Sequence, residues 1–248
     1  IYAPALAHYA SNLAGFDIIN GVYSYGITSG KAKLTMIAQA QKAALAALGD
    51  RKGTVGIYNY KTGEILCAVT TPTYDPDNIP DIQTDTTGAY EGVYLNRFTQ
   101  SSYIPGSIFK IVTLAAALEA IPDIEEQTFY CEGYYTVGDE EITCEGQHKK
   151  QTLQQAFQNS CNSAFAQIAL QLGDETLQRY AQQFGITEPV TFDGITTASG
   201  NFDAEGAYDI NLAWSAIGQH KDQINPCGFM TFMGAIAGGA ETFFGKNK

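Results

Sequence analysis

The sequence predicts an α+β fold in which a helical block is inserted into a sheet region. Three observations point to this class: two adjacent β-forming segments around a turn, a helix directly before them, and several helical patterns in the second half. Strands grouped in one part and helices in another are typical of α+β architectures. The 248 residues, 45% of them hydrophobic, suffice for one large domain or two small ones.

The first elements follow from local signals taken in chain order. Residues 1–30 show no clear hydrophobic period and are expected to form a lead-in segment before a domain over residues 31–248. Thr35 is expected to cap a helix over residues 36–48, because the apolar residues that follow recur at helical spacing. Gly49 is the predicted end of that helix.

Strands are predicted next, over residues 54–60 and 64–70, because both segments are rich in β-forming residues. The triplet Lys61-Thr62-Gly63 between them is the expected turn. A long loop with several Pro and Asp residues follows. Later helices are predicted over residues 151–158, 163–172, 174–184 and 226–237.

Charge and hydropathy exclude two classes of partner. The chain has 26 Asp and Glu against 14 Lys and Arg, a net charge of -12, which argues against a nucleic-acid surface or an anionic membrane patch. No apolar run approaches the ~18 to 20 residues that span a bilayer, and the N-terminus lacks a signal pattern. We expect a soluble ectodomain, with any membrane anchor lying upstream.

The five cysteines are scattered, and none forms a Cys-x-x-Cys pair, so neither zinc nor another metal is expected. Cys131 and Cys144 flank residues 132–143, a predicted hairpin or loop. A disulfide between these two cysteines and a pair of free thiols both remain open. The chain contains no phosphate-binding or dinucleotide-binding glycine motif, and no cofactor is expected.

Ser107 and Lys110 form the most informative pair in the chain. They follow Pro105-Gly106, a turn signal, and open a stretch of strong helix formers that is apolar on nearly all sides. Residues three apart lie on one helix face, so the two side chains can meet. A buried lysine tends to lose its proton, and a neutral amine beside a hydroxyl can activate it as a nucleophile.

A second polar group, Ser160-Cys161-Asn162, falls in the break between two predicted helices. Residues two apart point away from each other on a helix, so Ser160 and Asn162 can face one site only if the backbone turns there. Ser160 could transfer a proton, and Asn162 could hold an amide through its donor and acceptor groups.

These motifs resemble those of the transpeptidase domain of class B, monofunctional penicillin-binding proteins. Ser107-x-x-Lys110 and Ser160-x-Asn162 occur in the order that this family requires. The resemblance covers most of the chain and extends to other segments. They are Lys31 to Thr35, Thr62-Gly63-Glu64-Ile65-Leu66, Pro72-Thr73-Tyr74-Asp75-Pro76, Ile217-Gly218-Gln219 and Ala235-Ile236-Ala237-Gly238-Gly239.

The resemblance implies a penicillin-binding protein or serine β-lactamase-like fold, with an antiparallel sheet flanked by helices and an all-α subdomain. It implies Ser107 as nucleophile, Lys110 as its base, Ser160 as proton relay and Asn162 as a clamp on the substrate amide. It also implies D,D-transpeptidation of peptidoglycan stem peptides at the outer face of a bacterial membrane, during division or in shaping the cell. The implied partners are stem peptides, β-lactam antibiotics and cell-wall synthesis or divisome proteins.

The sequence departs from the family in one motif. The family has a Lys-[Thr/Ser]-Gly motif on a strand downstream of Ser-x-Asn, and nothing after Asn162 supplies it. Lys61-Thr62-Gly63 precedes the nucleophile and is expected to be an ordinary turn. The chain therefore resembles a domain that ends before the last sheet strands. The alternative hypotheses are a D,D-carboxypeptidase or β-lactamase, a penicillin-sensing receptor domain, and an inactive fragment.

Overall fold

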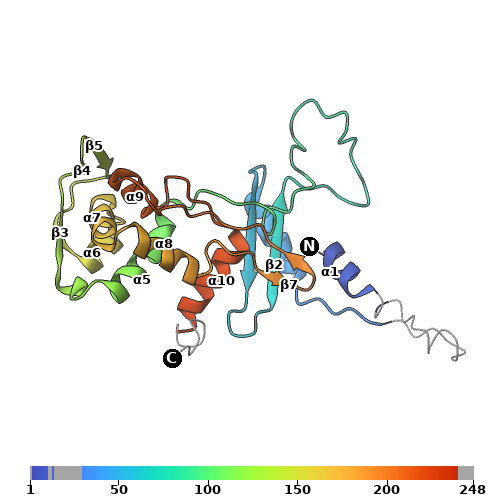
Figure 1. Ribbon diagram of the computed structural model, residues 1–248. Helices are drawn as coiled ribbons and strands as arrows, with labels where there is room; N and C mark the ends of the chain where they lie inside the picture. The colour runs from blue at the N-terminus through green and yellow to red at the C-terminus, as the bar shows by residue number, and fades with distance from the viewer. Residues whose placement is uncertain (1, 11–12, 14–29, 240–248) are drawn as a thin grey trace, which may run out of the picture. The chain divides into compact units, whose positions relative to one another are not determined.

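The computed structural model describes residues 2–10, 13 and 30–239 (Figure 1). Its helices and antiparallel strand pairs confirm the α+β class. The chain divides into two compact units, each built from segments distant in sequence. Most of the predicted lead-in segment lies outside the described residues. Within the described residues, unit 1 comprises 2–10, 13, 30–101, 189–198 and 225–239, and unit 2 comprises 102–188 and 199–224.

The predicted hairpin is present in unit 1. Strands β1 (Gly53–Tyr58) and β2 (Ile65–Thr71) pair antiparallel, with a register irregularity near the turn. Gly63 in that turn has φ +78°, a conformation that favours glycine. The triplet Lys61-Thr62-Gly63 is therefore a hairpin turn, as the sequence predicts.

Helix α4 (Ala38–Leu48) packs on β2. Ala44 of the helix and Cys67 and Val69 of the strand form a small apolar core. The helix begins later than predicted, and Thr35 is not its cap. The Thr35 hydroxyl instead donates a hydrogen bond of 2.7 Å to the carbonyl of Ile65, so it ties the segment before the helix to the hairpin.

Helix α10 (Pro226–Ala237) has the predicted bounds and lies against β1. The Asn225 side chain caps it by accepting hydrogen bonds from the backbone N–H groups of Cys227 and Gly228. At Gly234, a Cβ would lie 1.3 Å from the Tyr58 hydroxyl oxygen. The absence of a side chain at this position lets the helix approach the strand closely.

The remaining described elements of unit 1 are α1 (Tyr2–His8), β7 (Thr191–Phe192) and β8 (Ile195–Thr196). Strands β7 and β8 form a short antiparallel pair. The Tyr9 hydroxyl, just after α1, donates to the Asp193 carboxylate at 2.9 Å, between the two strands.

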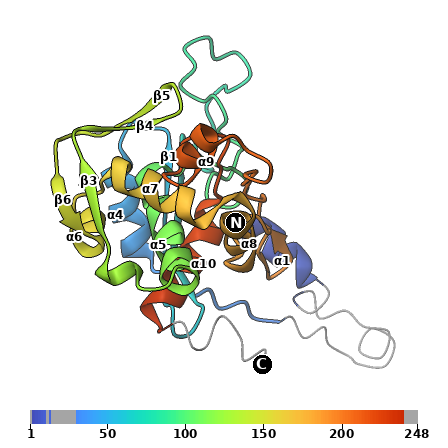
Figure 2. The same ribbon diagram turned by 60° about the vertical axis from the view of Figure 1, so that its left-hand side comes forward.

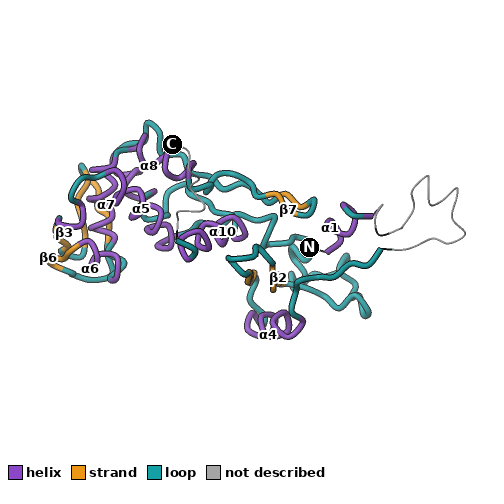
Figure 3. The backbone as a smooth tube through the Cα atoms, turned by 90° about the horizontal axis from the view of Figure 1, so that it is seen from below, coloured by secondary structure: helices purple, strands orange, loops and turns teal. Residues whose placement is uncertain are grey.

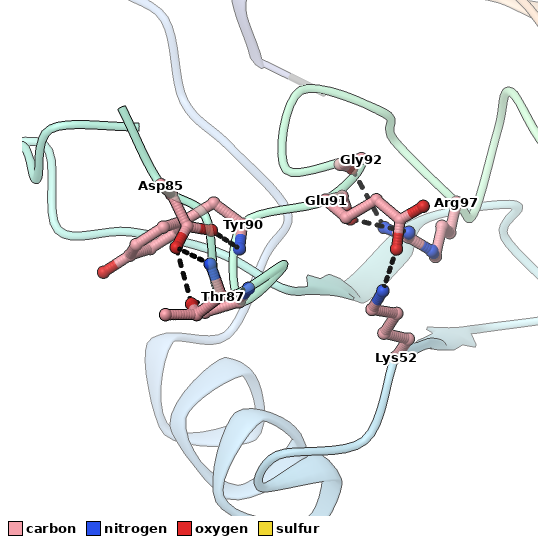
Figure 4. Close-up of polar contacts among 8 residues, drawn as sticks. Lys52, Asp85, Thr87, Tyr90, Glu91, Gly92 and Arg97 are labelled. Atoms are coloured by element: carbon pink, nitrogen blue, oxygen red, sulfur yellow. Dashed lines mark hydrogen bonds and ion pairs between the residues drawn. The ribbon is translucent and has the colours of Figure 1, made fainter. Parts of the chain in front are cut away.

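The long loop after β2 is organised by local polar contacts (Figure 4). The Asp85 carboxylate accepts hydrogen bonds from the Thr87 hydroxyl and from the backbone N–H groups of Thr87 and Tyr90. Further along, Glu91 pairs with Lys52. Both partners of this ion pair are exposed, so it contributes little to stability.

Unit 2 is mainly helical and also contains two antiparallel strand pairs (Figures 2 and 3). Helix α7 (Asn162–Leu172) is largely buried and contacts neighbours on several sides. The helices around it are α5 (Lys110–Ala120), α6 (Leu153–Gln158), α8 (Asp174–Gln183) and α9 (Asp209–Ser215), with the short η2 (Ile124–Glu126) nearby. The strand pairs are β3 (Thr128–Cys131) with β6 (Lys149–Thr152), and β4 (Tyr134–Val137) with β5 (Glu140–Thr143).

Residues 132–143, predicted to be a hairpin or loop, contain the antiparallel β4–β5 pair and are therefore a hairpin. Helices α6, α7 and α8 lie where the sequence predicts them, whereas α9 was not predicted. Among the described residues, no helix combines the length and apolar character needed to cross a membrane.

Candidate active site

Ser107 lies in η1 (Gly106–Phe109), a short 3-10 helix that leads directly into α5. The backbone N–H of Gly106 donates to the carbonyl of Gly218 at 2.9 Å. Gly218 has φ +75°, and a Cβ there would lie 2.2 Å from the Gly106 carbonyl oxygen. The close approach of two backbone segments therefore fixes the turn that carries Ser107.

Helix α5 is anchored by residues that flank Lys110. Phe109 is fully buried, and its ring stacks on that of Phe202 with centroids 5.0 Å apart. The Thr113 hydroxyl donates to the Ala216 carbonyl at 2.7 Å. These contacts hold the first turn of α5, and with it the base of the Lys110 side chain.

The break between α6 and α7 forms a turn over residues 160–162, as the sequence predicts. Ser160 has φ +49°, a left-handed conformation that is uncommon outside glycine. Cys161 then takes the N-cap position of α7, and its sulfur accepts a hydrogen bond of 3.4 Å from the backbone N–H of Ala164. Strained backbone of this kind is concentrated at functional sites.

The four predicted site residues come together around the Lys110 amine. Lys110 Nζ lies 3.1 Å from Ser107 Oγ and 3.0 Å from Ser160 Oγ. It lies 2.6 Å from both Asn162 Oδ1 and the Ser160 carbonyl oxygen. Lys110 is only 1% exposed, whereas Ser107 and Ser160 are exposed. The arrangement is a buried amine beneath two accessible hydroxyls.

These contacts suit a neutral amine. The carbonyl of Ser160 and Asn162 Oδ1 can only accept hydrogen bonds, and a neutral amine has two N–H groups to give them. Its lone pair is then free for a hydroxyl, which can donate as well as accept. Ser107 Oγ is within reach of that lone pair, so its proton can pass to Lys110 Nζ.

The pKa of Lys110 agrees with this geometry. Burial lowers it from 10.5 to about 8, because the charged ammonium loses solvation. The nearby ionisable side chains of Cys144, Cys161 and Glu145 oppose this lowering of the Lys110 pKa in part. A substantial fraction of the lysine is therefore neutral near physiological pH.

Two supporting contacts were not predicted from the sequence. The Asn162 side-chain amide donates to the carbonyl of Thr143 at 2.9 Å, which orients its oxygen towards Lys110. A backbone carbonyl leaves no signal in a sequence. The ring of Phe165 lies 5.8 Å from Lys110 Nζ. The sequence did contain a signal for this contact, because Phe165 is three residues after Asn162 and therefore lies on the same helix face.

Cys131 and Cys144 are free thiols in the structure. Of the two possibilities that the sequence leaves open, the structure therefore has the unbridged one. Their two sulfur atoms nevertheless lie within 4.8 Å of each other.

Comparison with known proteins identifies the family. A family model described as the penicillin binding protein transpeptidase domain matches residues 53–242. The peptidoglycan D,D-transpeptidase PbpA of Mycolicibacterium smegmatis is 34% identical over 184 residues, covering 64% of this chain and 36% of that protein. The chain covers only 25% to 36% of the length of three of the curated relatives that it matches.

Solved structures show the same fold. The D,D-transpeptidase domain of a peptidoglycan glycosyltransferase from Eggerthella lenta is 28% identical, with a TM-score of 0.75 over 92% of this chain and 61% of that one. Penicillin-binding protein A of M. tuberculosis, solved as a penicillin G acyl-enzyme complex, has a TM-score of 0.76 at 22% identity, over 94% of this chain and 59% of that one.

The family match spans most of the chain and includes both polar groups around Lys110. The α+β structure agrees with the fold of the solved domains. The chain belongs to the penicillin-binding protein transpeptidase domain family.

Proposed function

We propose that this chain carries the serine acylation site of a peptidoglycan D,D-transpeptidase. One observation carries the proposal: the buried amine of Lys110 lies within hydrogen-bond distance of the Ser107 and Ser160 hydroxyls and of the Asn162 side chain. An unprotonated lysine beside a serine is the arrangement that activates a hydroxyl for attack on a carbonyl. The similar proteins include D,D-transpeptidases, which supports this reaction.

Acylation begins when Ser107 Oγ attacks the carbonyl of the D-Ala-D-Ala peptide bond and its proton passes to Lys110 Nζ. The carbonyl oxygen becomes an oxyanion, and the Ser107 backbone N–H is a candidate donor to it. Collapse of the tetrahedral intermediate breaks the C–N bond. The terminal D-Ala leaves once its nitrogen has received a proton, and an ester to Ser107 remains.

Ser160 is suited to deliver that proton. Its hydroxyl lies 3.0 Å from Lys110 Nζ, so it can take a proton from the ammonium and pass its own to the leaving amine. Lys110 is then neutral again. Asn162 is suited to hold the substrate amide, because its side chain is already oriented by Thr143.

The ester is then resolved by an amine of a neighbouring stem peptide, which forms the new amide and returns the proton to Ser107. A β-lactam would enter the same route, because its strained amide replaces the D-Ala-D-Ala bond. With this substrate, the proposal includes a site on the extracytoplasmic face of a bacterial membrane. Membrane anchoring and cell-wall synthesis partners belong to the same proposal for the whole protein.

Transpeptidation and carboxypeptidation differ in the molecule that accepts the acyl group from Ser107, which is an amine in the first reaction and water in the second. The protein is incubated with a D-Ala-D-Ala peptide, with and without an added D-amino acid, and products are measured by mass spectrometry. We expect release of D-Ala and a product in which the added amine replaces it. Hydrolysed product alone would favour a D,D-carboxypeptidase.

A matched control is the exposed Ser199 of the same unit. We expect Ser199→Ala to react as the wild type does and Ser107→Ala to release no D-Ala. D-Ala release that is equal in all three proteins would overturn the proposal.

A further inference from the structure

Four side chains outside the acylation chemistry meet in unit 2 with the composition of a zinc site. Their ligand atoms, the sulfurs of three cysteines and a ring nitrogen of a histidine, all lie within 4.8 Å of one another. The residues are Cys131, Cys144, His148 and Cys161. Neither the family match nor the proposed reaction assigns a role to this cluster.

The distances within the cluster fit a tetrahedral ion. Cys144 Sγ lies 3.6 Å from His148 Nδ1 and 3.9 Å from Cys161 Sγ. With Zn–S bonds of ~2.3 Å and Zn–N bonds of ~2.0 Å, neighbouring ligand atoms in a tetrahedral site lie ~3.5 to ~3.8 Å apart. The side chains therefore need little movement to close around one metal.

Each ligand comes from the end of a different element. Cys131 ends β3, Cys144 follows β5, His148 precedes β6, and Cys161 is the N-cap of α7. Antiparallel pairing of β3 with β6, and of β4 with β5, brings the first three together. Because the ligands come singly, no Cys-x-x-Cys pair is needed. From the sequence alone no metal is expected, because the chain lacks a Cys-x-x-Cys pair. The zinc site proposed below revises that expectation.

Polar groups around the sulfurs favour thiolates, the form that binds metal. The backbone N–H of Gly133 donates to Cys131 Sγ, and that of Ala164 donates to Cys161 Sγ, each at 3.4 Å.

Two buried side-chain donors beside the cluster, Ser163 Oγ and Gln151 Nε2, make no regular hydrogen bond within the described part of the chain. Ser163 lies beside the Cys131 thiol, and Gln151 lies beside the Cys161 thiol. Donors of this kind typically surround ligands of a bound metal and orient them.

We propose that Cys131, Cys144, His148 and Cys161 bind one Zn²⁺ ion in a closed structural site. Three thiolates and one imidazole form a ligand set that zinc prefers, with no open position for substrate. Binding releases the three thiol protons to solvent.

The site would support the active-site turn. Cys161 lies between Ser160 and Asn162, and Cys144 follows Thr143, whose carbonyl accepts the hydrogen bond from Asn162. The ion would therefore join both segments that position Asn162, and it would hold Ser160 in its left-handed conformation. Its role is structural, because none of its ligands contacts Lys110 Nζ in the hydrogen bonds of the site.

Metal content tests the proposal without any assay of activity. The protein, kept reduced, is equilibrated with Zn²⁺ alone, freed of unbound metal by gel filtration and analysed by plasma mass spectrometry. We expect one zinc per chain in the wild type and in the control Cys67→Ala, which removes a buried free cysteine of unit 1. Cys144→Ser combined with His148→Ala should lower the affinity by at least ~10-fold.

Cobalt provides a second measurement that requires no variant. Co²⁺ bound to the wild type should show strong thiolate-to-metal absorption, and added Zn²⁺ should remove it.

Three results would overturn the proposal. They are reduced wild-type protein that binds no zinc or cobalt, zinc binding that is equal in the double variant, and a Cys131–Cys144 disulfide that forms even in the presence of Zn²⁺.

Discussion

The ionisable amine of Lys110 is almost completely buried, and its protonation state should make the acylation rate sensitive to pH. Burial lowers the pKa of Lys110 to about 8. Only the neutral amine can take the Ser107 proton, so the acylation rate should rise with pH through about 8 and then level off. Stopped-flow measurement with a chromogenic β-lactam from pH 6 to 10 gives this profile. A rate that is independent of pH over this range would show that Lys110 is not the base.

Asp222 is a further buried ionisable residue of unit 2 whose protonation state depends on pH near neutrality. It is 1% exposed, and neither carboxylate oxygen has a regular hydrogen bond among the described residues. Burial raises its pKa to about 7, against a weaker opposing effect of Ser215. Because the unfolded pKa is ~3.9, the folded state retains a proton that the unfolded state loses between these values. Stability should therefore fall as pH rises from about 4 to about 7.

Asp222→Asn should remove this dependence, because the amide has the same shape and no charge. At pH 8 we expect the variant to be more stable than the wild type, by up to about 4 kcal/mol, from ~1.4 kcal/mol for each unit of pKa shift. Urea unfolding followed by fluorescence of Trp214, the single tryptophan, measures this difference. Equal stability of the two proteins at pH 8 would mean that ionisation of Asp222 does not lower the free energy of unfolding, which would contradict this prediction.

Individual site residues were predictable to different degrees. Ser107 and Lys110 are three residues apart, so helix geometry alone predicts that they meet. Ser160 and Asn162 are about fifty residues away, and only the family resemblance joined them to the first pair. Asn162 is oriented by the backbone carbonyl of Thr143. Every residue type has a backbone carbonyl, so no sequence pattern could have indicated this contact.

At the scale of elements, the turn before α5 depends on Gly218. A Cβ at this position would lie 2.2 Å from the Gly106 carbonyl oxygen and 2.8 Å from Phe109 Cβ. Gly218→Ala should therefore displace η1 and move Ser107 away from Lys110. We expect the rate of acylation by a β-lactam to fall by at least ~100-fold, as small misplacements of reacting groups can do.

Gly206→Ala is the matched control for that variant. Gly206 has a similar φ of +69°, and a Cβ there would have no atom within 4 Å. This substitution carries the backbone strain without the clash, at a cost of ~1 to 2 kcal/mol in stability. It should leave the acylation rate nearly unchanged. If both variants acylated at the wild-type rate, the Gly106–Gly218 contact would not position Ser107.

Elements with strong local signals were predicted well. The hairpin, α10 and the helices of unit 2 that end at glycine have bounds close to those predicted. Helix α9 has seven residues and lacks a side-chain cap, so it has few local signals. Thr35 was wrongly predicted to be a helix cap. Threonine is a good capping residue, but the Thr35 hydroxyl donates to a strand that is distant in sequence. The cysteine cluster was missed because strand pairing, and not sequence spacing, brings its members together.

At the scale of the whole molecule, segments far apart in sequence build each unit. Residues 189–198 return to unit 1, residues 199–224 belong to unit 2 again, and residues 225–239 return to unit 1 a second time. The predicted insertion of a helical block agrees with this division. The acylation site and the cysteine cluster both lie within unit 2, so one unit contains the chemistry proposed here.

The central claim is that Ser107 is a nucleophile activated by Lys110. Its most direct test is the intact mass of the protein after incubation with a penicillin, for the wild type and for Ser107→Ala, Lys110→Ala and Ser199→Ala. Opening of the β-lactam ring releases no atoms, so one acylation adds the mass of the whole drug.

We predict a single adduct in the wild type and in Ser199→Ala, none in Ser107→Ala, and adduct formation slowed by at least ~100-fold in Lys110→Ala. Peptide mapping should place the adduct on Ser107. An adduct that persists in Ser107→Ala, or a wild type that forms none, would contradict the account.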